Sequence, residues 1–132
     1  MIVIDASAAV DYLVEAGAEG SWVREAIRSE PEVAAPHLID LEVVSSLRKL
    51  LARHEVARTR AEIALVDFRD LELIRYPATT LLERVWALRN HLTAYDAAYV
   101  ALSEALAVPL VTTDARLARS HGHRAEIVAY PA

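Results

Sequence analysis

The chain of 132 residues contains no cysteine and only three glycines. The absence of cysteine excludes disulfides, thiolate zinc sites and cysteine nucleophiles, and it is compatible with a reducing cytoplasm, where we expect the protein to reside. With so few glycines, the chain also lacks the glycine-rich loop that cradles phosphates in many nucleotide-binding proteins. No histidine lies in a motif that would place it beside a nucleophile. These absences leave carboxylates and hydroxyls as the main candidates for chemistry.

Long apolar runs and a basic leader are missing as well. No apolar run is long enough to cross a bilayer, so we expect no membrane partner. Residues 1–7 meet an acid at position 5 and carry no basic residue, which argues against a signal peptide. The net charge of −5 argues against broad, nonspecific nucleic-acid binding but leaves room for a local basic path. Lys49 is the only lysine, and this arginine bias reflects either genome composition or the fit of guanidinium to phosphate.

Short apolar runs alternate with longer helical patterns along the whole chain. We predict strands over residues 2–4, 32–35, 73–76, 109–112 and 126–129. Helices are predicted over residues 6–14, 22–28, 38–53, 59–70, 80–91, 95–106 and 115–120. Their expected end signals are N-caps at Ser21 and Thr93, capping boxes that begin at Thr59 and Thr80, and a C′ glycine at Gly122. The alternation predicts one domain, residues 1–132, of the three-layer α/β class with a mostly parallel sheet of four to five strands.

Four carboxylates fall where predicted strands end and the following helices begin. Asp5 ends the first strand, and Asp114 lies just past the fourth. Asp96 stands in the first turn of a crossover helix, and Glu42 lies within the first two turns of the helix that starts at residue 38. A crossover helix starts at the edge where parallel strands end, so all four should meet at one edge of the sheet. Open α/β folds bind their ligands at this edge.

Four converging carboxylates repel one another, so either some take up protons or a cation holds them together. Oxygen-only ligands suit Mg²⁺ or Mn²⁺, and such an ion commonly serves phosphodiester cleavage. The alternative for Asp5, Asp96 and Asp114 is a helix cap, which contributes about 0.5–2 kcal/mol. Glu42 has no capping role, although it could pair with an arginine. The hydroxyls of Ser7, Thr112 and Thr113 either support the carboxylates or a metal-bound water, or belong to ordinary turns.

Other residues leave further alternatives open. Arg116 and Arg119, just past Asp114, either contact RNA phosphates or form a solvated helix face. Tyr95 and Tyr99 either stack on bases or pack in the core. The two histidines of His121-Gly-His123 either bind a metal or interact favourably with the dipole at a helix C-terminus. A phosphoaspartate receiver also begins with a strand that ends in Asp, but it needs a lysine at a later strand end. Lys49 lies in mid-helix, which disfavours that class.

Four segments of the chain resemble PIN-domain ribonucleases, and within these they look most like the VapC toxins of bacterial toxin–antitoxin pairs. The segments are IVIDASAAV, LIDLEVVSSLR, LTAYDAAYVALS and PLVTTDARLA. They are individually short, but they occur in the expected order and spacing over nearly the whole chain. The resemblance implies a PIN-like, flavodoxin-like fold, a homodimer and a cognate VapB-like antitoxin. Such an antitoxin would cover an apolar groove near the N-terminal helices, to which Trp22, Val23 and Ile27 could contribute, as they could to an ordinary core.

Carried over residue by residue, the family's metal-binding acids fall on Asp5, Glu42, Asp96 and Asp114. Its supporting hydroxyls fall on Ser7 and Thr112. Some members carry another acid three residues beyond the Asp114 position, where this chain has Leu117, so a second metal would be weakly held. The resemblance also implies that an antitoxin arginine inserted among the carboxylates would neutralise them.

The predicted function is that of a Mg²⁺- or Mn²⁺-dependent endoribonuclease toxin acting on tRNA, rRNA or mRNA. A metal-activated water would cleave the strand and leave 5′-phosphate and 3′-hydroxyl ends. Two alternatives stay open. One is a PIN nuclease that processes RNA outside a toxin system, and the other is an inactive PIN fold that serves as a binding module. The presence of all four acids argues against the inactive module.

Overall fold

The computed structural model describes residues 1–131, and these form one sheet of five parallel strands. The strand order is β3-β2-β1-β4-β5. The strands are β1 (Ile2–Ile4), β2 (Val33–Pro36), β3 (Ile74–Tyr76), β4 (Leu110–Thr112) and β5 (Ile127–Ala129). All five lie within one or two residues of their predicted positions, and β5 is an edge strand as expected.

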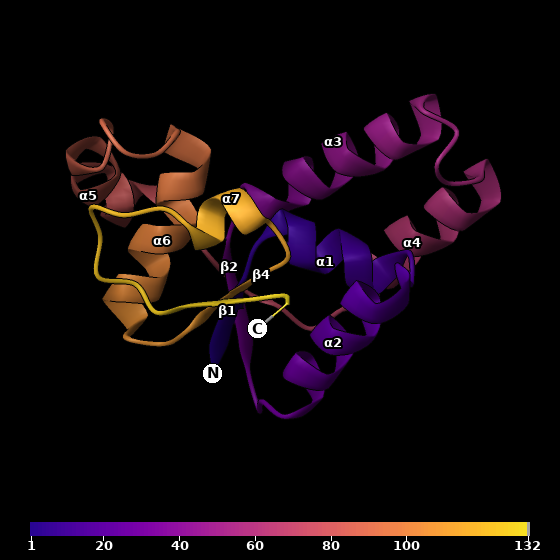
Figure 1. Ribbon diagram of the computed structural model, residues 1–132, viewed down its shortest axis with the longest axis horizontal. Coiled ribbons are helices and arrows are strands. Elements are labelled where there is room, and N and C mark those ends of the chain that lie inside the picture. The colour runs from indigo at the N-terminus through magenta and orange to yellow at the C-terminus, as the bar shows by residue number, and fades with distance from the viewer. Residues whose placement is uncertain (132) are drawn as a thin grey trace.

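Helices cover both faces of this sheet (Figure 1). One group contains α1 (Ala6–Leu13), α2 (Gly17–Arg28), α3 (Ile39–Ala52) and α4 (Arg58–Asp70). The other contains the 3₁₀ turn η1 (Ala78–Leu81), α5 (Leu82–Ala87) and α6 (Ala94–Leu106), while the short α7 (Ala115–Ala118) lies between β4 and β5. The predicted three-layer α/β/α class with a parallel sheet is confirmed.

The central strands are apolar throughout because helices cover them on both sides. In β1, Val3 and Ile4 are fully buried, and Ala34 of β2 and Leu110 of β4 are equally inaccessible. The edge strands β3 and β5 are only partly buried. Burial on both faces explains why the strands appear in the sequence as continuous apolar runs without polar alternation.

Helix boundaries follow the predicted end signals only in part. Thr93 caps α6 as predicted, because its hydroxyl oxygen accepts a hydrogen bond from the Asp96 backbone N–H at 3.2 Å. The predicted cap at Ser21 is wrong, since α2 already begins at Gly17, whose φ of +59° allows the tight turn after α1. Gly20 then lets α2 approach α1, because a Cβ there would lie 2.6 Å from the carbonyl oxygen of Asp11.

Three other predicted end signals are wrong. Helix α4 begins at Arg58, so Thr59 already lies within the first turn, and no side chain caps this helix. Thr80 lies in η1, and α5 ends at Ala87 instead of residue 91. Helix α7 ends at Ala118, so Gly122 is not its C′ residue. Gly122 does have a positive φ of +88°, which serves the loop that follows.

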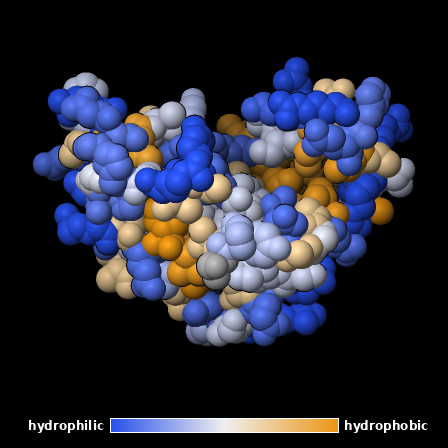
Figure 2. Space-filling view, in the orientation of Figure 1, coloured by the Kyte–Doolittle hydropathy of each residue, from blue (hydrophilic) through white to orange (hydrophobic). Residues whose placement is uncertain are grey.

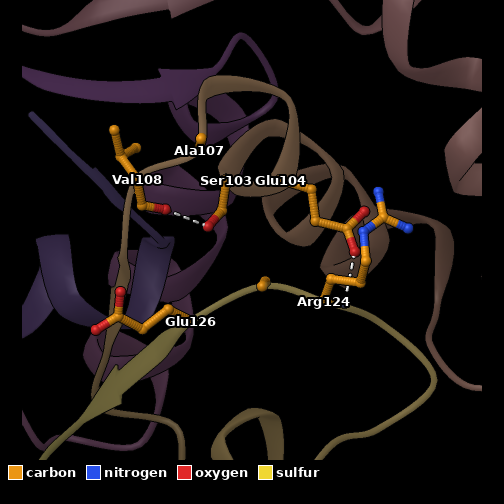
Figure 3. Close-up of a pocket in the computed structure, with 7 residues that line it drawn as sticks. Ser103, Glu104, Ala107, Val108, Arg124 and Glu126 are labelled. Carbon is orange, nitrogen blue, oxygen red and sulfur yellow. Dashed lines mark hydrogen bonds between the residues drawn. The ribbon is translucent and has the colours of Figure 1, made fainter.

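A carboxylate clamp holds the C-terminal end of α6. Glu104 accepts hydrogen bonds from Arg84 Nε at 2.7 Å, from Arg84 Nη2 at 3.0 Å and from the Arg124 backbone N–H at 2.6 Å. Figure 3 shows Glu104 facing Arg124 and the Ser103 hydroxyl donating to the carbonyl of Val108. The hydrogen bond from Arg84 lowers the pKa of Glu104. The clamp fastens α6 to α5 and to the loop before β5, and it thereby fixes the helix whose other end carries Asp96.

An exposed apolar groove lies between α3 and α4. Figure 2 shows hydrophobic side chains gathered in the hollow beside these helices. Leu41 is 77% exposed, and Val44, Leu65 and Val66 join it in a groove of about 640 Å³. Trp22 and Val23 were among the residues expected to contribute to an antitoxin groove near the N-terminal helices. Val23 is instead fully buried in the core, and Trp22 packs against Tyr130 with ring centroids 5.7 Å apart. Within residues 1–131, no helix is long and apolar enough to span a membrane.

Candidate active site

The structure brings all four predicted acids to the carboxyl edge of the sheet. Asp5 directly follows β1, and Asp114 lies two residues after β4, the strand that pairs with β1. Asp96 stands in the first turn of α6, and Glu42 in the first turn of α3. Strands β2 and β3 lie on one side of β1, and β4 and β5 lie on the other. The strand order therefore reverses beside β1, and this is the topological switch point where α/β folds bind ligands.

Asp5 is held in a cradle of hydrogen bonds at the base of the site. Its Oδ1 accepts from Ser7 Oγ at 2.7 Å and from the Ala8 backbone N–H at 2.9 Å, while its Oδ2 accepts from Thr112 Oγ1. Asp5 is therefore also the N-cap of α1, so the capping interpretation and the site interpretation apply together. Burial raises the pKa of Asp5 to about 6, although these hydrogen bonds oppose the shift.

Two hydroxyls join the ends of β1 and β4. Thr112 Oγ1 accepts from the Asp114 backbone N–H at 3.0 Å while it donates to Asp5, so one fully buried hydroxyl connects two of the acids. Ser7 Oγ lies 3.2 Å from Thr112 Oγ1 and accepts from the Thr113 backbone N–H at 3.3 Å. Ser7 and Thr112 thus position the carboxylate of Asp5 in the manner of supporting residues around a functional group.

Glu42 turns inward from α3 and meets Tyr99 of α6. The Tyr99 hydroxyl donates to Glu42 Oε1 at 2.7 Å, and the tyrosine is only 1% exposed, so it cannot stack on a base. Burial raises the pKa of Glu42, and the charge of Asp96 adds to that shift. Burial and the bond to Glu42 also raise the pKa of Tyr99, which keeps its proton. Sequence reasoning missed this partner, although Tyr99 lies three residues after Asp96 and so shares its helix face.

Asp96 and Asp114 form the exposed half of the site and share one arginine. Arg116 Nη2 lies 3.4 Å from Asp96 Oδ2 and 3.3 Å from Asp114 Oδ2. Burial raises the pKa of Asp96, Arg116 opposes that shift, and the charge of Asp114 adds to it. Asp114 also caps α7, since its Oδ1 accepts from the Arg116 backbone N–H at 2.9 Å. Arg116, predicted to contact phosphate, is thus drawn to the carboxylates in this structure.

The remaining predicted positions lie around this core. Arg119 is exposed beside Arg116, and Leu117 is buried, so position 117 adds no carboxylate to the site. His123 uses both ring nitrogens locally, with Nε2 2.9 Å from Ser120 Oγ and Nδ1 accepting from the Ala125 backbone N–H at 3.2 Å. His121 instead packs edge-on against His91, with ring centroids 5.3 Å apart. His121 and His123 therefore do not form a chelating pair.

The donor atoms at this edge fit a hard divalent cation. They are carboxylate and hydroxyl oxygens, with no nitrogen or sulfur ligand among the predicted acids and their supporting residues. Electrostatic repulsion links Asp5 to Asp114, Asp114 to Asp96, and Asp96 to Glu42. Across residues 1–131, however, no three histidine, aspartate or glutamate side chains lie close enough together to enclose an ion. In this structure Asp96 and Asp114 instead contact Arg116, while Asp5 is held by Ser7 and Thr112.

The family model for the PIN domain matches residues 2–121. The chain belongs to the PIN-domain family. This PIN domain is 42% identical to ribonuclease VapC12 of Mycobacterium tuberculosis over 127 residues, which are 96% of this chain and 97% of that relative. The resemblance to VapC ribonucleases seen in the sequence is thereby confirmed.

Solved structures share the fold of this PIN domain. PAE2754 from Pyrobaculum aerophilum has a TM-score of 0.68 at 25% identity and covers 96% of this chain and 83% of its own. M. tuberculosis VapC20, a toxin that cleaves the sarcin–ricin loop, has a TM-score of 0.67 at 15% identity. The match covers 89% of this chain and 93% of VapC20. A chain of a toxin–antitoxin complex from Klebsiella pneumoniae has a TM-score of 0.61 at 18% identity. The match covers 97% of this chain and 96% of that one.

Proposed function

We propose that this PIN domain is a divalent-metal-dependent endoribonuclease and the toxin of a VapBC-type pair. The observation that carries the proposal is the gathering of Asp5, Glu42, Asp96 and Asp114 at the switch point of the sheet. Burial raises the pKa of three of these acids, so their charges destabilise the fold unless a cation joins them. Relatives named as ribonucleases support RNA as the substrate, from the tRNA, rRNA or mRNA class.

Asp5, Asp96 and Asp114 would hold Mg²⁺ or Mn²⁺, and Glu42 would reach the ion or its waters. When bound, the ion would supply a water activated for in-line attack on phosphorus and would stabilise the charge that develops there. The resulting products would carry 5′-phosphate and 3′-hydroxyl ends. This chemistry needs neither a catalytic histidine nor the RNA 2′-hydroxyl.

The surrounding residues prepare the site for that task. Ser7 and Thr112 hold the Asp5 carboxylate in one orientation, and Tyr99 does the same for Glu42, so two of the acids are positioned before any ligand arrives. Arg116 is 70% exposed, which leaves it free to turn from the carboxylates to a phosphate oxygen. A guanidinium binds phosphate with the same geometry that it uses for carboxylate.

Cleavage of total RNA tests this function. Purified wild-type protein and Asp96→Asn are compared with Mg²⁺, with Mn²⁺ and with EDTA, and the ends of the fragments are analysed. We expect discrete cuts with 5′-phosphate ends that disappear with EDTA and in the variant. Fragments ending in 2′,3′-cyclic phosphate would contradict the mechanism. A wild type that binds RNA but never cuts it would favour the inactive binding module.

A VapB-like antitoxin is the proposed partner, and the groove between α3 and α4 is the surface that it would cover. Leu41, Val44 and Leu65 are exposed there, and such a patch usually marks an interaction site. A neighbouring reading frame whose product co-purifies with this chain, and loses it in Leu41→Asp, would support the pairing. Absence of any such frame would favour the PIN nuclease of RNA processing. The homodimer stays a prediction, which sedimentation of the purified chain would check.

A further inference from the structure

A small pocket adjoins the carboxylates between the start of α6 and α7. Its volume is about 220 Å³. Asp96 and Arg116 form one side of it, so it is continuous with the candidate active site. The rest of its lining is polar or cationic at the rim and apolar below: His91, Leu92, Thr93, Leu117, Arg119, Ser120 and His121. Whatever binds here lies directly beside the group that binds the carboxylates.

Two exposed imidazole rings lie together in the lining of this pocket. The centroids of His91 and His121 are 5.3 Å apart, and their planes meet at 69°. The backbone of Gly122 is shaped around His91, because a Cβ at this position would lie 2.5 Å from His91 Cγ and 2.7 Å from its Nε2. Glycine is therefore required at position 122 for two reasons, namely its positive φ and the His91 ring that leaves no room for a Cβ. The ring pair is a packed feature of the fold and not an accident of two mobile side chains.

The chemistry of the pocket suits one unpaired nucleotide. Its volume is below the 300–1,000 Å³ range of pockets for drug-sized ligands, so it has room for one base and not for a duplex. Exposed histidine rings and arginine guanidinium planes are groups on which unpaired RNA bases stack. Arg119 is exposed at the rim and forms no ion pair within residues 1–131, so it is available to a phosphate.

We propose that this pocket seats the nucleotide next to the cleaved phosphate. The base would stack on the His91–His121 pair, and Arg119 would bind the adjoining phosphate. This inference rests on the proposed ribonuclease function and adds a site to it. Stacking tolerates any base, so the pocket selects unpaired RNA over paired RNA without reading a sequence.

Binding of oligoadenylate that contains 2-aminopurine tests the pocket, because the fluorescence of that base reports stacking. All variants are made in an Asp5→Asn background to keep the strand intact, and cleavage is measured separately with Asp5 in place. His121→Ala removes the ring, His121→Phe keeps a ring without its nitrogens, and Arg119→Glu reverses the rim charge. The matched control is Arg53→Glu at the far tip of α3, which makes the same change in net charge (Figure 1).

We expect His121→Ala to weaken binding about 5- to 100-fold and to abolish the fluorescence change, while His121→Phe retains most of both. Arg119→Glu should weaken binding well beyond Arg53→Glu. The pocket is refuted if the wild type binds and cleaves RNA while His121→Ala binds as tightly as Arg53→Glu. A wild type that neither binds nor cleaves RNA overturns the ribonuclease function, and the pocket with it.

Discussion

The two ends of helix α6 carry carboxylates in opposite situations. At the C-terminal end, Glu104 is paired with Arg84 at 2.7 Å, and this hydrogen bond lowers its pKa. At the N-terminal end, burial raises the pKa of Asp96, and the one arginine near it is shared with Asp114 and largely exposed. The same helix therefore holds one acid that stabilises the fold when charged and one that destabilises it.

The contrast separates a structural acid from acids kept for a ligand. Asp5 and Glu42 resemble Asp96 in that burial raises the pKa of each, and unlike Asp96 neither forms an ion pair with an arginine or lysine in residues 1–131. Unpaired acids that oppose folding are retained where a function needs them. Substitutions at the two kinds of acid should thus change stability in opposite directions, and only those at the unpaired acids should lower activity.

Asp5→Asn should have the largest effect on activity. It removes a charge that would hold the cation, and such stabilisation is worth several kcal/mol, so cleavage should fall at least about 100-fold. Initial rates on the RNA cut by the wild type provide the measurement. Asp67→Asn, at an exposed site on α4, is the matched control and should cleave normally. If Asp5→Asn cleaves RNA at a rate within about threefold of the wild type, Asp5 has no role in cleavage.

The same Asp5→Asn substitution should stabilise the metal-free protein at neutral pH. Folding raises the pKa of Asp5 from 3.8 to about 6, so between these values the folded chain binds more protons than the unfolded chain. The contribution of Asp5 to the free energy of unfolding therefore falls as pH rises through this window, by up to about 3 kcal/mol. Urea unfolding in EDTA at pH 4 and pH 7.5 measures it. A pH dependence identical in wild type and variant would contradict the raised pKa.

Thr112→Val should weaken metal binding about 10- to 100-fold, because supporting groups commonly contribute that much. The variant keeps the shape of the side chain but removes the donor to Asp5 and the acceptor for the Asp114 N–H. Thr112→Ser, which retains the hydroxyl, should recover most of the affinity. If valine and serine behave alike in Mn²⁺ titrations, the hydroxyl has no role in orienting these acids.

On stability, Glu104→Gln should have the opposite effect to Asp5→Asn. It should lower the free energy of unfolding by about 1–3 kcal/mol, since it leaves Arg84 without its charged partner, while cleavage is unchanged. Because the pKa of Glu104 is lowered on folding, its contribution is present above its ordinary value and is lost as pH falls below it. Glu62→Gln is the control, as its partner Arg58 is exposed and the pair should contribute little. Equal losses in the two variants would contradict the clamp.

Much of this architecture could be predicted from local sequence. The runs that form β1, β2 and β4 are apolar because the strands are buried on both faces, and topology then places the acids after them at one edge. The cap at Thr93 was predictable because it joins two residues of the same short segment, Thr93 and Asp96. The boundary at Ser21 was not, because the close approach of Gly20 to Asp11 decides where α2 packs.

The contacts between distant segments could not be predicted. Tyr99 and Glu42 are separated by 57 residues, and nothing local in either helix indicates that they meet. The attachment of Arg116 to Asp96 likewise depends on how α7 sits against the start of α6. The sequence could select the acids of the site and the hydroxyls of Ser7 and Thr112 that hold Asp5, but not the partners of Glu42 and Asp96 on distant segments.

Binding of Mn²⁺, measured by isothermal titration calorimetry, tests the central claim that these carboxylates form a cation site. We predict that the wild type and Glu104→Gln bind Mn²⁺ alike, and that Asp5→Asn, Asp96→Asn and Asp114→Asn each lose most of the affinity. Equal binding by all five proteins, or no binding by the wild type, would contradict the account.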